Sequence, residues 1–104
     1  MIELYQAEWC PYSHRVRQRF TELGVAFVAQ QVEANPEDRQ ALREISGQAS
    51  IPVLVDGDVV VTEPDRIVAY LDERFEPRPD ARRHREKAIV EADLLGRPPA
   101  PWAG

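Results

Sequence analysis

The sequence predicts an α/β domain with a four-stranded mixed sheet, in the element order βαβαββα followed by one more helix. Three features support this fold class. Short apolar runs alternate with amphipathic helical segments. Gly24 and Gly47 follow two of those segments, where a glycine commonly ends a helix, and Asp56-Gly57 separates two valine runs, as in a tight hairpin. With 104 residues, 43% of them hydrophobic, the chain is long enough for one modest core.

The first half of the chain is expected to form two strands and two helices. An apolar-rich run at residues 2–6 predicts a strand, and a helical pattern follows it as far as Gly24. A second strand begins at Ala26, and a strand, helix and strand of this length imply a right-handed crossover between two parallel strands. The second helix begins at Asn35, which would cap it, and its charged residues, Arg39 among them, predict a solvated face.

Valine-rich runs at residues 53–55 and 59–61 predict a β-hairpin. An Asp-Gly pair lies between them and supplies the positive φ angles that a tight turn between antiparallel strands needs. Because the runs are not interrupted by polar residues, we expect both strands to be covered on both faces.

Two more helices are expected after the hairpin. One begins near Thr62, either through a Thr-x-x-Asp capping box or with Pro64 at its first position. Residues 1–76 would then form the domain proper. Residues 77–104 would be a C-terminal extension, with a helix over about residues 81–95 and a proline-rich tail that cannot continue it.

Charge and composition exclude several classes of partner. A net charge of −5 argues against nucleic acid or an anionic membrane as a partner, since both need a basic surface. No window approaches the roughly 18 apolar residues of a membrane span, and the N-terminus, with Glu3 almost at once, does not resemble a signal peptide. A single cysteine excludes an internal disulfide and favours the reducing cytoplasm. We expect a cytoplasmic monomer or weak homodimer.

Cys10 lies between the first predicted strand and the first predicted helix, with Pro11 at the first helical position. Unpaired backbone N–H groups and the positive end of the helix dipole favour an anion there, so we expect Cys10 to react as a thiolate. His14, Arg15 and Arg17 add positive charge in the first two turns. The alternative is a small buried residue chosen only for packing.

The stretch Cys-Pro-Tyr-Ser at residues 10–13 resembles the glutaredoxin active-site motif Cys-Pro-Tyr-Cys, with Ser13 in place of the second cysteine. Ser-Ile-Pro at residues 50–52 is similar to the Thr-Val-Pro segment of that family. Residues 62–71 resemble the helix start shared by glutaredoxins and the N-terminal domain of glutathione transferases. The three motifs follow the family order within residues 1–75. The resemblance implies a thioredoxin-like fold of the glutaredoxin type.

The resemblance also implies a ligand site built from separate segments. In the family, the proline that matches Pro52 is cis and faces the active cysteine, and the residue matching Ile51 pairs its backbone with the cysteinyl part of glutathione. Glu63 and Asp65 would hold an α-amino group of the ligand. The ligand-binding residues that we expect are Tyr12, Gln48, Ile51, Pro52, Glu63 and Asp65.

Without a second cysteine the implied reaction is monothiol. The Cys10 thiolate would attack a mixed disulfide, release the protein thiol and remain bonded to a small thiol, which a second small thiol then removes. Ser13 would donate a hydrogen bond toward the thiolate, cap the helix, or do both. Ala7 and Gln48 stand where the family usually has cations that contact the glycine carboxylate of glutathione. At the helix start, glutathione transferases commonly have a serine whose N–H and hydroxyl bind the γ-glutamyl carboxylate, and Pro64 has neither group. The co-substrate is therefore glutathione or another small thiol.

Three alternatives stay open. In the first, two chains share an iron–sulfur cluster through Cys10, although Pro11-Tyr12 differs from the Gly-Phe usual in cluster carriers. The others are a truncated glutathione transferase without its helical second domain, and a non-catalytic thioredoxin-fold domain that binds proteins. No other metal site is expected, because His14 and His84 are far apart and no second cysteine is present.

Overall fold

A computed structural model describes residues 1–94, in which one mixed sheet of four strands has the order β2-β1-β3-β4. β1 (Glu3–Gln6) and β2 (Val28–Gln31) are parallel. β3 (Val53–Asp56) is antiparallel to β1 and to β4 (Val59–Thr62). The predicted four-stranded mixed sheet and its βαβαββα order are confirmed.

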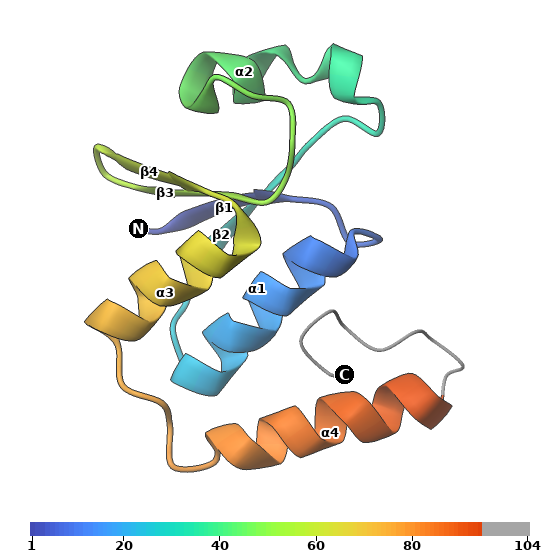
Figure 1. Ribbon diagram of the computed structural model, residues 1–104, viewed down its shortest axis with the longest axis vertical. Helices are drawn as coiled ribbons and strands as arrows, with labels where there is room; N and C mark the ends of the chain where they lie inside the picture. The colour runs from blue at the N-terminus through green and yellow to red at the C-terminus, as the bar shows by residue number, and fades with distance from the viewer. Residues whose placement is uncertain (95–104) are drawn as a thin grey trace.

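The helices cover the two faces of the sheet unequally (Figure 1). α1 (Pro11–Leu23) and α3 (Pro64–Arg74) lie side by side on one face. The other face carries only the short helix α2 (Gln40–Ser46), which follows a 3-10 turn η1 (Pro36–Asp38). α4 (Ala81–Leu94) packs against α1 on the side away from the sheet. The predicted tail lies outside the described residues, and none of the described helices is long and apolar enough to cross a membrane.

The main core lies between the sheet and the pair α1 and α3. Leu4, Leu54 and Val61 stand opposite one another in the strand register and therefore share a face of the sheet. α1 and α3 contribute apolar residues at helical spacing, so each helix presents one stripe to this face. The helical members of the cluster are Val16, Phe20, Leu23, Ile67 and Leu71.

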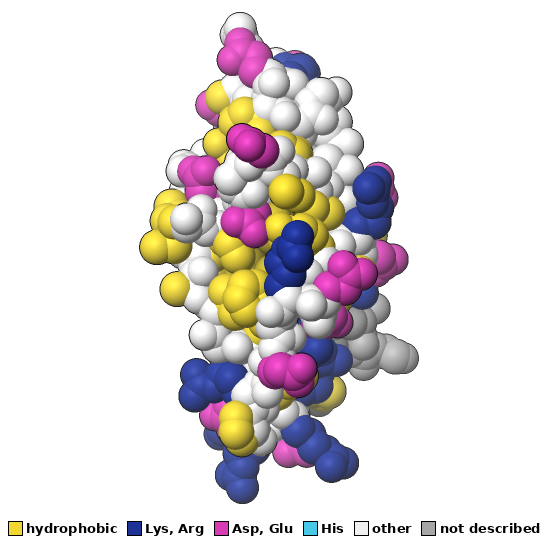
Figure 2. Space-filling view, turned by 90° about the vertical axis from the view of Figure 1, so that its left-hand side faces the viewer, with side chains coloured by type: hydrophobic (Ala, Val, Ile, Leu, Met, Phe, Trp, Pro, Cys, Tyr) yellow, Lys and Arg dark blue, Asp and Glu magenta, His cyan; other side chains and the backbone are white. Residues whose placement is uncertain are grey.

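Two local expectations are wrong. Val53 is fully buried, but Val59 and Val60 are each 40% exposed on the edge strand β4. Val60 lies on the face that carries only the short helix α2, and Val59 lies at the hairpin end of the opposite face. Hydrophobic side chains accordingly gather on the side of the molecule that carries the hairpin (Figure 2). Asn35 makes no capping hydrogen bond: the second helix is broken at Arg39, which has φ −85° and ψ 58°. At α3 the structure has Pro64 at the first position, and no side chain caps the helix.

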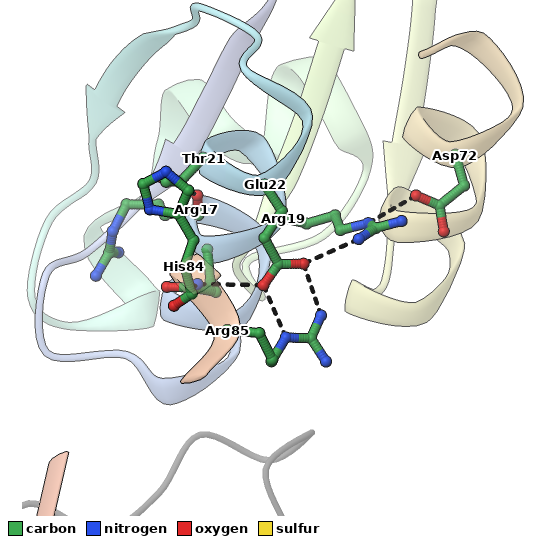
Figure 3. A network of polar contacts seen from close by, with 8 residues as sticks. Arg17, Arg19, Thr21, Glu22, Asp72, His84 and Arg85 are labelled. Carbon is green, nitrogen blue, oxygen red and sulfur yellow. Dashed lines mark hydrogen bonds and ion pairs between the residues drawn. The ribbon is translucent and has the colours of Figure 1, made fainter. Parts of the chain in front are cut away.

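A buried carboxylate joins α4 to the rest of the domain. Glu22 on α1 is almost fully buried, and Arg85 of α4 donates two hydrogen bonds of 2.7 Å to its carboxylate. Arg19 and Gln18 donate one each, at 2.9 and 3.1 Å, and Arg19 also reaches Asp72 on α3 at 2.8 Å (Figure 3). The Glu22 carboxylate therefore joins α4 to α1, and Arg19 continues the network to α3.

Burial raises the pKa of Glu22, but the hydrogen bonds from Arg85, Arg19 and Gln18 lower it by more, so the pKa lies below its ordinary value of 4.5. A carboxyl group whose folded-state pKa is depressed stabilises the fold fully above its unfolded-state pKa. That contribution is lost as the pH falls through the folded-state pKa. The docking of α4 should therefore weaken in acid.

We expect Glu22→Gln to lower the free energy of unfolding at neutral pH by about 2 kcal/mol, because it leaves Arg19 and Arg85 without their shared carboxylate. Asp72→Asn is the matched control and should cost less than about 1 kcal/mol, since that ion pair is partly exposed. Urea unfolding at a series of pH values measures both. The deficit of Glu22→Gln should shrink below about pH 4.5, and a deficit that does not change with pH would contradict this assignment.

Candidate active site

The strand register brings three segments to one edge of the sheet. Tyr5 pairs with Val53, and Val53 pairs with Thr62, so the end of β1, the start of β3 and the end of β4 lie side by side. The chain runs from β1 into the turn before α1, enters β3 through Ile51-Pro52, and leaves β4 directly into α3. All three motifs that the sequence analysis singled out therefore meet at the same edge.

Cys10 is the N-cap residue of α1, as predicted, with extended backbone angles and Pro11 at the first helical position. Its Sγ accepts the Ser13 N–H at 3.4 Å, and its carbonyl accepts the His14 N–H at 3.0 Å. The Ser13 N–H therefore points at the sulfur from the first turn of α1. The side chain is only 6% exposed, while Tyr12 beside it is exposed. Little of Cys10 is therefore exposed to solvent.

Ser13 is fully buried one helical turn after Cys10. The hydrogen bond to the sulfur comes from its backbone N–H, whereas its hydroxyl has no hydrogen-bond partner among the described residues. An unpaired buried hydroxyl costs about 1–3 kcal/mol. The expected hydrogen bond from the Ser13 hydroxyl to the sulfur is therefore not formed in the structure.

The segment before β3 has the predicted cis bond between Ile51 and Pro52. Pro52 is fully buried and Ile51 is half-buried. Gln48, expected to face the ligand, donates its side-chain amide to the Ser50 carbonyl at 3.4 Å, and its backbone N–H bonds to the Ser46 hydroxyl at 3.2 Å. The Gln48 side chain therefore contacts the neighbouring backbone in this structure.

Glu63 and Asp65 flank the start of α3. Glu63 has φ 74°, the only positive φ of a non-glycine residue within residues 1–94, and such backbone strain costs about 1–3 kcal/mol and tends to occur at functional sites. Asp65 is exposed and forms an ion pair with Arg15 of α1. The carboxylate expected to hold an amino group of the ligand is thus already paired with a cation, which ties the starts of the two helices together.

Arg17 has a role that the sequence did not reveal. Besides adding positive charge near Cys10, its guanidinium donates to the side chain of Gln6 and to the carbonyls of Ala7 and Glu8, the latter two at 3.3 and 3.4 Å. It also forms an ion pair with the Glu8 carboxylate at 3.3 Å. Arg17 therefore holds the turn that leads from β1 to Cys10.

Arg39, expected on a solvated face, is instead buried and donates to three backbone carbonyls. No spacing in the sequence distinguishes it from the exposed Arg43, which lies one turn later on α2. The histidines lie on different helices, and His84 is 3.4 Å from the Asp80 carboxylate. Among the described residues, no group of three or more His, Cys, Asp or Glu is placed to hold a metal ion.

Comparison with known proteins identifies the family to which the chain is similar. Residues 4–79 match the family described as glutathione S-transferase, N-terminal domain. A stringent starvation protein A homolog of Coxiella burnetii is 40% identical over 79 residues, which are 76% of this chain and 37% of that protein. Glutaredoxin 3 of Escherichia coli is 31% identical over 51 residues, which are 49% of this chain and 61% of that protein.

A solved structure agrees with the fold. The diazinon-metabolizing glutathione S-transferase of the silkworm Bombyx mori superposes with a TM-score of 0.65 at 26% identity, over 71% of this chain and 38% of that one. The predicted resemblance and the thioredoxin-like fold are both confirmed. Because the family match covers most of its length, the chain belongs to the glutathione S-transferase N-terminal domain family.

Proposed function

We propose that this chain is a monothiol thiol–disulfide oxidoreductase that removes or transfers a small thiol through Cys10. The observation that carries the proposal is the position of the only cysteine at the N-cap of α1, where its sulfur accepts a backbone N–H. The same edge of the sheet carries Ile51-Pro52, directly before β3, and we expect the backbone of this segment to dock a peptide-like ligand. Likeness to glutathione S-transferases and to glutaredoxin 3 supports this reaction class.

The reaction consists of two thiol–disulfide exchanges. First, the Cys10 thiolate attacks the small-thiol sulfur of a mixed disulfide, a new S–S bond forms, and the protein thiolate leaves and takes a proton from water. Second, the thiolate of another small thiol attacks the small-thiol sulfur on Cys10. This forms the disulfide of the small thiol and restores the Cys10 thiolate. Overall, the protein sulfur of the mixed disulfide is reduced to a thiol, and one free small thiol is oxidised as it enters the small-thiol disulfide.

The co-substrate is glutathione or another small thiol. Ala7 is buried and Gln48 is neutral, so neither supplies the cation that glutaredoxins offer to the glycine carboxylate. Arg17, beside Ala7, gives its guanidinium to Gln6, Ala7 and Glu8. This arrangement favours a weak glutathione site or a small thiol without that carboxylate. The same proposal includes a cytoplasmic location, where the small thiol is supplied. Its substrates are protein mixed disulfides, and the protein is a monomer or weak homodimer.

A second candidate is a domain that binds proteins and whose cysteine is inert. The observations in its favour are the 6% exposure of Cys10 and the exposed aromatic side chains of Trp9 and Tyr12 on either side of it. The first experiment below separates the two functions.

Reduced protein mixed rapidly with the glutathione mixed disulfide of a small substrate that has no second thiol should gain the mass of one glutathione. Cys10→Ser should gain nothing, because the chain has no other cysteine. Intact mass spectrometry at short times makes the measurement, and the alkylation rate of Cys10 near neutral pH is the control for thiol reactivity. No mass gain together with slow alkylation would favour the protein-binding domain; no gain with fast alkylation would point to another small thiol.

Ser13→Ala tests whether the unpaired Ser13 hydroxyl donates a hydrogen bond during the reaction. The variant keeps the backbone N–H but loses the hydroxyl, so the rate of the first exchange should fall about tenfold if that hydroxyl donates to the thiolate. Since the hydroxyl is unpaired in the folded state, the free energy of unfolding should be unchanged or slightly higher.

Ser46→Ala provides the contrast in stability. The Ser46 hydroxyl donates to the Leu42 carbonyl at 2.8 Å, so its loss should cost about 1 kcal/mol. Single-turnover kinetics and urea unfolding make both comparisons. An unchanged rate in Ser13→Ala would show that the hydroxyl takes no part in the exchange.

A further inference from the structure

Arg39 is a buried cation that contacts backbone carbonyls. Its side chain is 4% exposed at the break between η1 and α2. Nε donates to the Glu33 carbonyl at 2.8 Å, Nη2 to the Ala34 carbonyl at 3.0 Å and Nη1 to the Ala49 carbonyl at 2.9 Å. No carboxylate within residues 1–90 forms an ion pair with it.

A buried guanidinium is tolerated only when its N–H groups are satisfied, and here carbonyl oxygens supply the partners. The guanidinium is a rigid planar fork, so the three carbonyls must occupy fixed directions around one plane. A lysine carries the same charge on a single nitrogen and cannot reproduce that spread of donors. The contact therefore depends on arginine in particular and not on positive charge alone.

The three carbonyls belong to two segments of the chain that are far apart in sequence. Glu33 and Ala34 follow β2, whereas Ala49 lies two residues before Ile51 at the candidate site. The other hydrogen bonds of this loop are local: Gln48 bonds to Ser46 and to Ser50. Because Arg39 also bonds to Glu33 and Ala34, its hydrogen bond to Ala49 connects the loop before β3 to the segment that follows β2.

We propose that Arg39 is a positioning residue, which holds Ile51 so that its backbone can pair with the small-thiol ligand. This inference rests on the proposed function, because it takes Ile51 as the residue that docks the ligand. Arg39 touches neither Cys10 nor the ligand, and it acts through the Ala49 carbonyl. Its loss should weaken ligand docking while the reactivity of the thiol itself stays the same.

Arg43, on α2 four residues after Arg39, is the matched control. It also donates to two carbonyls, Glu37 at 3.1 Å and Pro36 at 2.6 Å, but it is exposed, and both partners lie in the adjoining turn. Replacing it removes a similar number of hydrogen bonds without releasing the loop before β3.

The test compares Arg39→Lys with Arg43→Lys in the full chain. In Arg39→Lys, the KM for a glutathione mixed disulfide should rise about tenfold while kcat changes less than about twofold. The rate of Cys10 alkylation by iodoacetamide should stay at the wild-type value. Backbone NMR order parameters of residues 49–51 should fall from about 0.85 toward about 0.6. Arg43→Lys should match the wild type in all of these measurements.

A second variant covers the case in which Arg39→Lys does not fold. Arg39→Met keeps an unbranched buried side chain and removes the charge together with the donors, and it should raise KM in the same way. Unchanged KM in a folded Arg39 variant would overturn the proposal, whether or not the loop becomes mobile, and so would an equal fall in alkylation rate and turnover. If the wild type itself shows no turnover, the proposed function fails, and the order parameters alone support or overturn the role of Arg39.

Discussion

The pairing of β3 with both β1 and β4 is the constraint on which the candidate site depends. Tyr5, Val53 and Thr62 stand in one row across the sheet, so the segments next to them must emerge at one edge. A register shift of one residue would turn Leu4, Leu54 and Val61 away from α1 and α3, so the core holds the register in place. The apolar core therefore also determines which backbone segments lie beside the thiol.

Two buried charged side chains, Glu22 and Arg39, position segments outside the sheet, and each has a different kind of hydrogen-bond partner. Glu22 is paired with arginines from two helices, and this pairing brings α4 against α1. Arg39 has no ion-pair partner among the described residues and relies on carbonyls, so it fixes backbone rather than helices. Because each ion would be costly to bury alone, each enforces the geometry of its partners. The first sets the position of the C-terminal helix, and the second sets the approach to Pro52.

The features that the sequence predicted correctly are those whose chemistry is local. Gly24 ends α1 with φ 68° and the Cys-Pro junction begins it, because these depend on residues next to one another. The cis Ile51-Pro52 bond was expected from the family resemblance and is found in the structure. The buried ions were missed for the opposite reason. A charged residue on an amphipathic helix looks the same in sequence whether it meets water or, as Glu22 does, an arginine 63 residues away. The exposed edge of β4 was missed because a valine run does not show how far the neighbouring helix extends.

The proposed reaction needs only one cysteine, and in the structure Cys10 is largely buried at the start of α1. A small thiol can reach the sulfur, stay bonded to it and be removed by another small thiol from solution, since nothing in that cycle requires a resolving cysteine. In the proposed reaction, the ligand also needs a backbone segment held at a fixed position beside the thiol. That requirement falls on the loop before β3, where Arg39 is the restraint that comes from outside the loop.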